Sequence, residues 1–94
     1  MSINTGTYGA TPAVLDLSYQ GAPTVSLIPG IGNTSKCEAT LTPGAFANPG
    51  AANWFPWSFG TVSVPTNSVF FGKVTALRFT RMTGSSSDTY EVVT

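Results

Sequence analysis

Few of the residues that carry most protein chemistry occur in this sequence, which has no histidine, one cysteine and four carboxylates. The carboxylates are Asp16, Glu38, Asp88 and Glu91, and each is expected on the polar face of a strand or in a hairpin loop. A glycosidase needs two carboxylates at a fixed separation across a sugar. The positions of the four carboxylates in the sequence single out no such pair, and solvated charges or salt bridges are the simpler interpretation. Zinc needs Cys or His ligands and calcium needs several converging oxygen atoms, so the sequence predicts no catalytic residue, no metal site and no cofactor.

Aromatic residues form the most specific feature of the sequence. Trp57 and Phe59 lie two positions apart, so we expect them to share one strand face and to belong to the core. Trp54 and Phe55 follow a loop at residues 42–53 that is rich in Pro, Gly, Ala and Asn, and we expect them to be exposed. Loops of this length are uncommon in compact domains and often functional. The aromatic pair is therefore suited to a subunit interface.

Composition narrows the class of protein. Only 9% of the 94 residues are charged, with four cations and four anions, while 41% are hydrophobic. Nucleic-acid-binding proteins cluster Lys and Arg, and disordered chains combine low hydrophobicity with high net charge. The 10 Gly and 7 Pro residues favour turns and strands over a helical bundle. With four cations and no net charge, we expect no nucleic-acid partner. No apolar stretch approaches a membrane span and the first residues lack a signal-peptide pattern, so we expect no membrane partner and synthesis in a cytosol.

Alternating hydrophobicity predicts about six strands, separated by turn residues. They are expected at residues 13–19, 24–28, 35–41, 60–64, 69–82 and 89–93, with turns at 20–23 and 65–68. The last two strands are expected to pair as an antiparallel hairpin through the polar loop at 83–88. Cys37 falls on an apolar strand face with Ala39 and Leu41, which predicts a buried core residue rather than a reactive thiol. A single cysteine forms no internal disulfide.

These elements predict an all-β fold, a small antiparallel β-sandwich, with a compact β-barrel as the second choice. Residues 13–94 are expected to form one sandwich domain. Residues 1–12 have no hydrophobic period and are rich in Gly and Thr. They are expected to form an extended N-terminal arm, either loose or ordered on a neighbouring subunit.

The second half of the sequence resembles small virion structural proteins of tailed bacteriophages. The resemblance lies in residues 53–62 (NWFPWSFGTV), residues 73–81 (KVTALRFTR) and the terminal TYEVV at residues 89–93. It implies a non-enzymatic, multi-copy subunit located in the virion, either a capsid decoration or cement protein or a tail or neck component. It also implies a symmetric homo-oligomer that contacts other virion proteins, such as the major capsid protein.

Contacts to these partners are expected from the N-terminal arm, the long loop and exposed sheet edges. The candidate interface residues are Tyr8, Phe46, Trp54, Phe55 and Arg78. The resemblance gives Arg78 an inter-subunit or buried hydrogen-bonding role, for which a planar guanidinium is suited, and an exposed strand cation is the alternative. A different function is a carbohydrate-binding module or fibre component, in which a sugar stacks on one accessible face formed by Tyr19, Trp54 and Phe55.

Overall fold

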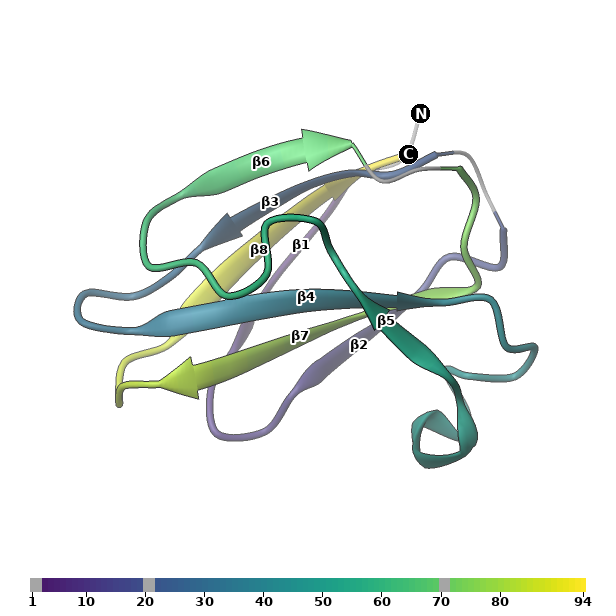
Figure 1. Ribbon diagram of the computed structural model, residues 1–94, viewed down its shortest axis with the longest axis horizontal. Coiled ribbons are helices and arrows are strands. Elements are labelled where there is room, and N and C mark those ends of the chain that lie inside the picture. Colours follow the sequence, from purple (N-terminus) through teal and green to yellow (C-terminus); the bar gives the residue numbers. More distant parts are fainter. Residues whose placement is uncertain (1–2, 20–21, 70–71) are drawn as a thin grey trace.

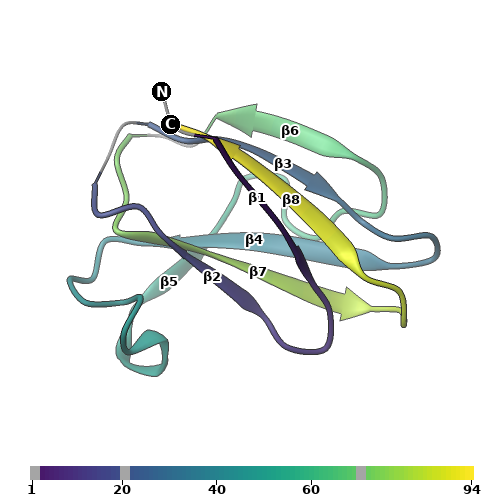
Figure 2. The same cartoon turned by 180° about the vertical axis from the view of Figure 1, so that it is seen from behind.

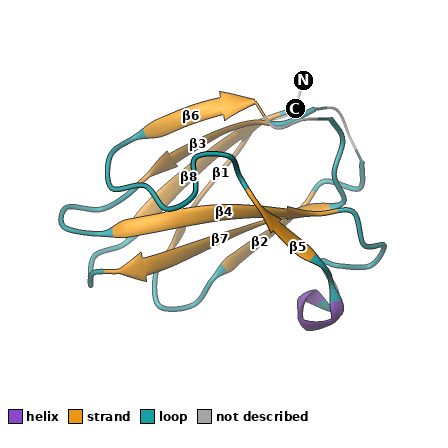
Figure 3. Cartoon of the chain, in the orientation of Figure 1, coloured by secondary structure: helices purple, strands orange, loops and turns teal. Residues whose placement is uncertain are grey.

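Eight strands and one short 3-10 turn make up the computed structural model, which describes residues 3–19, 22–69 and 72–94. The strands are β1 (Ile3–Tyr8), β2 (Ala13–Asp16), β3 (Thr24–Ile28), β4 (Thr34–Thr40), β5 (Trp54–Pro56), β6 (Thr66–Val69), β7 (Ala76–Thr83) and β8 (Asp88–Val93). The 3-10 turn η1 (Pro49–Ala51) precedes β5 (Figure 3). The predicted all-β sandwich is confirmed, and no closed barrel forms.

Two four-stranded antiparallel sheets face each other (Figure 1). Sheet A has the strand order β1-β8-β3-β6, and sheet B has the order β2-β7-β4-β5. Every connection crosses between the sheets except the one from β4 to β5, as the reverse view also shows (Figure 2). The predicted hairpin of the last two strands is therefore wrong, because β7 pairs with β2 and β4 while β8 pairs with β1 and β3.

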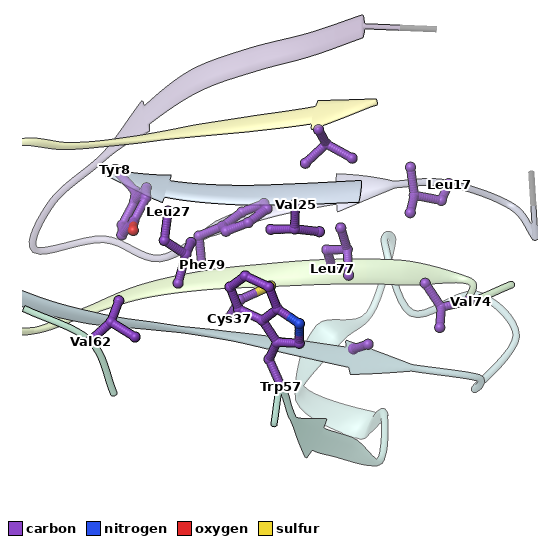
Figure 4. Packing of buried hydrophobic residues seen from close by; sticks show 12 residues of the cluster. Tyr8, Leu17, Val25, Leu27, Cys37, Trp57, Val62, Val74, Leu77 and Phe79 are labelled. Atoms are coloured by element: carbon purple, nitrogen blue, oxygen red, sulfur yellow. The ribbon is translucent and has the colours of Figure 1, made fainter. Parts of the chain in front are cut away.

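The core lies between the sheets and is filled mainly by alternate residues of the central strands (Figure 4). Phe79 on β7 is fully buried, and its ring stacks on the Tyr90 ring of β8 at a centroid distance of 4.2 Å. Trp57 reaches the same core from the segment after β5, which confirms its predicted core position. Alternation along each strand places Phe79 and the other core residues of the strands on one face, and sandwich packing removes that face from water.

The predicted N-terminal arm is instead β1, an edge strand of sheet A that pairs with β8 along its length. Tyr8 is buried and donates a hydrogen bond from its hydroxyl to Ser35 Oγ at 2.9 Å, so its predicted interface role is wrong. Burial raises the pKa of Tyr8 to about 12. The strand lacked a visible hydrophobic period because Gly6 occupies an inward position, where a Cβ would lie 2.7 Å from the Tyr90 ring. The described part of residues 1–12 therefore belongs to the domain.

The segment between β5 and β6 departs from the predicted pattern. Phe59 is 49% exposed, not buried, because residues 57–60 form a turn closed by a Gly60 N–H to Trp57 carbonyl bond of 2.9 Å. Strand alternation does not apply in a turn. Instead of a strand at 60–64, only Val62 forms a bridge, with Ser35. Residues 66–68 of the turn expected at 65–68 instead belong to the strand β6.

The long predicted strand at 69–82 is divided in the structure. Val69 ends β6, and β7 begins at Ala76. Gly72 has a φ of +77°, which fits the bend expected there. Residues 70–71 of this prediction, residues 20–21 of the predicted turn and residues 1–2 of the predicted arm lie outside the described residues.

Cys37 is fully buried on β4 and free, as predicted. Burial, with a smaller contribution from the Glu38 carboxylate, raises the pKa of its thiol well above the ordinary value. The thiolate is the reactive form of cysteine. Both burial and protonation therefore keep this side chain unreactive while the protein is folded.

We expect an aromatic disulfide reagent to modify Cys37 at least about 100-fold more slowly in the native protein than in urea, because reaction requires opening of the core. The measurement is the rate of thionitrobenzoate release with and without denaturant at the same pH. Equal rates would contradict the buried position.

Candidate binding site at the β5 edge

The loop between β4 and β5 is organised by short-range hydrogen bonds that bring its two ends together. The Thr42 N–H donates to Thr40 Oγ1 at 3.1 Å, and the Asn53 N–H donates to Thr42 Oγ1 at 3.1 Å. The Trp54 indole N–H donates to the Pro49 carbonyl at 3.0 Å, which fastens η1 beside β5. The loop projects beyond the sheet next to β5 (Figure 3).

A surface hollow of about 370 Å³ lies where the loop ends meet. It is lined by Leu41, Thr42, Asn53 and Phe55. Leu41 is exposed rather than inward as predicted, because β4 ends at Thr40 and the chain leaves the sheet there. Phe55 pairs with Ala39 and therefore belongs to the inward row of sheet B, yet it remains 42% exposed because β5 is the edge strand.

Tyr19 lies at the margin of this hollow. Its hydroxyl donates to the Leu41 carbonyl at 2.7 Å, and its side chain is exposed. Ser18 and Tyr19 both have positive φ angles, +48° and +62°. Two consecutive non-glycine residues in the left-handed region are uncommon and strained. Backbone bonds from Ser18 N–H to the Thr75 carbonyl and from Tyr19 N–H to the Val74 carbonyl hold this turn in place.

Trp54 faces the opposite side of β5, on the outer face of sheet B. Its ring lies 4.5 Å from the Arg78 guanidinium carbon, a cation–π contact. Arg78 also donates to Glu38 Oε1 from Nε at 3.1 Å and from Nη2 at 2.8 Å. Lys36 Nζ lies 3.8 Å from the same oxygen. This cluster connects three neighbouring strands, β5, β4 and β7, and its arginine has partners within the chain.

The predicted sugar platform is therefore only partly assembled. Adjacent strand residues point to opposite faces, so Trp54 and Phe55 do not share one surface, whereas Phe55 lines the hollow and Tyr19 lies at its margin. Among the predicted interface residues, Phe46 is exposed on the long loop, and Arg78 is half-buried in its ion pair. The prediction missed Thr42 and Asn53, whose only sequence signal was their position at the two ends of the loop.

A buried polar cluster lies at the other end of the sandwich, around the start of β8. Asp88 was expected to be solvated in a hairpin loop, but it is fully buried. Its Oδ1 accepts hydrogen bonds from the Gly30 N–H at 2.6 Å and the Asn33 amide at 2.8 Å. Its Oδ2 has no hydrogen-bond partner within residues 3–19, 22–69 and 72–94. The Asn33 amide also donates to the Ser86 carbonyl at 2.7 Å, so the cluster ties the β3–β4 turn to the β7–β8 connection.

The other carboxylates remain apart from Asp88. Glu38 is largely buried and paired with Arg78, whereas Asp16 and Glu91 are exposed. Within the described part of the chain, no group of three or more His, Cys, Asp or Glu residues could hold a metal ion. No helix among the described residues is long and apolar enough to span a bilayer. Comparisons with protein-family models, with curated proteins and with solved structures find no match to this chain.

Proposed function

We propose that this chain is a non-enzymatic structural subunit of a tailed-bacteriophage virion, most specifically a capsid decoration or cement protein. In this proposal it assembles as a homo-oligomer and contacts other virion proteins such as the major capsid protein. The sequence resemblance supports the virion assignment. The observation that carries the assembly is the scarcity of charge on the sheet edges.

Three of the four edge strands contain no charged residue: β1, β5 and β6. Only β2 contains one, Asp16. An edge strand presents unpaired N–H and C=O groups to any other strand, and monomeric proteins commonly protect such edges with charges. The chain also has a net charge of zero, which gives copies no mutual repulsion. These edges are suited to pairing with another chain.

The direction of the strands is compatible with head-to-tail pairing of sheet A. All its neighbouring strands are antiparallel, so the two edge strands, β1 and β6, also run antiparallel to each other. When β6 of one copy lies beside β1 of the next, the antiparallel sheet continues without reversal. Such a heterologous contact generates a ring if the rotation closes and a filament if it does not.

Exposed apolar side chains lie at matching positions on the two edges. Ile3 pairs with Val93, Val93 pairs with Thr24, and Thr24 pairs with Val69, so one row crosses the outer face of sheet A. Ile3 is 65% exposed and Val69 is 59% exposed. If the row continues from copy to copy, Val69 of one copy packs against Ile3 of the next and both leave water. Phe46, exposed on the long loop, remains available for a different virion partner.

Charge placed at both edges tests this contact. By light scattering, we expect the native protein to have a mass at least twice the 9.8 kDa of one chain. We expect the double variant Ile3→Lys, Val69→Lys to be monomeric, because like charges meet at the junction. The variant Ile3→Lys, Val69→Glu is expected to restore assembly, since its charges are opposite.

Ile31→Lys is the matched control, because Ile31 is 98% exposed in a turn and lies on no sheet edge. It is expected to assemble like the native protein. A monomeric native protein, or a double-lysine variant of unchanged native mass, rejects the proposed edge contact. Circular dichroism of each variant separates loss of assembly from loss of fold.

A further inference from the structure

We propose that the hollow beside β5 binds one uncharged hexopyranose ring, such as the terminal residue of a glycan. This binding goes beyond the assembly function and involves different residues. The hollow is in sheet B, whereas the proposed contact between copies is at the edges of sheet A.

The size of the hollow suits a small ligand. Its volume of about 370 Å³ lies at the lower end of the range for small-molecule sites, about 300–1,000 Å³. A single sugar ring fits within such a volume. The hollow is open on the protein surface, so a ring bound there can remain joined to a longer glycan.

The apolar side of the hollow comes from Phe55 and Leu41. Phe55 is 42% exposed although its strand position is inward, so part of its ring is open to solvent. An aromatic ring carries partial negative charge on its face. The polarised C–H groups on one face of a pyranose are attracted to that surface, and the contact removes apolar area from water.

The polar side of the hollow comes from Asn53 and Thr42. The Asn53 side-chain amide is exposed and has no hydrogen-bond partner in the described chain, which leaves two donors and an acceptor for a ligand. Thr42 Oγ1 accepts the Asn53 N–H, and its hydroxyl hydrogen stays free to donate. The bond from the Tyr19 hydroxyl to the Leu41 carbonyl holds the margin of the hollow. Sugar hydroxyls can accept and donate at these positions.

The same lining disfavours other classes of small ligand. The described residues that line the hollow include no Lys or Arg, so a phosphate or carboxylate finds no charged partner among them. A purely apolar ligand would desolvate the Asn53 amide without replacing its hydrogen bonds, which is costly. A ligand with one C–H face and neutral hydroxyls satisfies both sides of the hollow.

Saturation-transfer NMR with methyl β-D-glucopyranoside and methyl β-D-galactopyranoside tests this proposal. The method detects weak ligands, and it is applied to the protein as purified, whether monomeric or assembled. We expect at least one sugar to receive saturation, most strongly at the axial C–H protons of one ring face, because that face stacks on Phe55. Absence of transfer to both sugars overturns the proposal, including the case in which a neighbouring copy fills the hollow.

Two variants locate the binding, and one controls for it. Phe55→Leu keeps an apolar side chain but removes the aromatic face, and Asn53→Ala removes the free amide without touching the Asn53 backbone bond. Each is expected to weaken sugar binding by at least about tenfold. Phe46→Leu makes the same substitution at an exposed position outside the hollow and is expected to bind normally. Undiminished binding by folded Phe55→Leu and Asn53→Ala, or an equal loss in Phe46→Leu, overturns the site.

Discussion

Replacement of Phe79 by alanine is expected to lower the free energy of unfolding by about 3–5 kcal/mol. Phe79 is fully buried at the centre of β7, stacked on Tyr90 with an angle of 4° between the rings and 5.8 Å from the Tyr8 ring centroid. Alanine removes apolar area from the core, leaves a cavity and breaks contacts that join the two sheets. Domains of this size are stable by about 5–15 kcal/mol in total, so the variant is expected to approach the limit of folding.

Urea unfolding followed by tryptophan fluorescence measures this loss, because Trp57 lies in the same core. Phe46→Ala is the matched control, since Phe46 is exposed, and we expect a change within about 0.5 kcal/mol. If Phe79→Ala is too unstable to measure, Phe79→Leu gives a smaller loss of the same origin. A Phe79→Ala variant no less stable than Phe46→Ala contradicts the core described above.

Replacement of Asp88 by alanine is expected to lower the free energy of unfolding by about 2–4 kcal/mol. The carboxylate is fully buried and accepts two hydrogen bonds, from the Gly30 N–H and the Asn33 amide. Alanine leaves both donors in a site shielded from water, where an unpaired polar group is costly. The turn from β3 to β4 and the connection from β7 to β8 then lose their shared partner.

Two comparisons test the origin of this loss. Asp88→Asn keeps an oxygen acceptor and is expected to lose less than Asp88→Ala, because the two donors can still be satisfied. Asp16→Ala removes an exposed carboxylate whose hydrogen bond comes from the Ser18 hydroxyl at 2.8 Å, and we expect a loss below about 1 kcal/mol. Chemical denaturation of all three variants measures the order. Equal stability of Asp88→Ala and Asp16→Ala would falsify the structural role of Asp88.

The proposed functions use separate parts of the sandwich. Assembly is proposed at β1 and β6, the edges of sheet A, while sugar binding is proposed at the β5 edge of sheet B. The buried Asp88 cluster lies at the β3–β4 turn and stabilises the fold without contributing to either surface. Variants in one region should therefore leave the properties of the other two regions unchanged. Their effects on the free energy of unfolding should add.

Most strand positions could be predicted from local alternation. The strand expected at residues 24–28 is β3, and the one expected at 89–93 lies within β8. Alternation is a property of neighbouring residues, so a sequence reports it directly wherever one strand face is apolar. It failed at β1, where inward Gly6 hides the pattern, and at Phe59, which a turn directs outward.

The candidate site was less accessible to prediction. The exposure of Phe55 was predicted from its place in the aromatic cluster after the long loop. A functional role for that loop was predicted from its length and its Gly- and Pro-rich composition. The separation of Trp54 from Phe55 depends on the pairing of β5 with β4, and the place of Tyr19 depends on a turn that meets Leu41, 22 residues further along the chain. Neither relation is visible in local sequence.

By itself, the sequence determined an all-β chain with few charges, a buried Cys37 and a core position for Trp57. Only the tertiary structure decided which strands are neighbours, and it placed consecutive strands β7 and β8 in different sheets. The physical reason is that strand formation depends on alternation within a few residues, whereas pairing depends on burying apolar faces far apart in the chain. The same long-range packing made Asp88 an internal hydrogen-bond acceptor and left the edges of sheet A open.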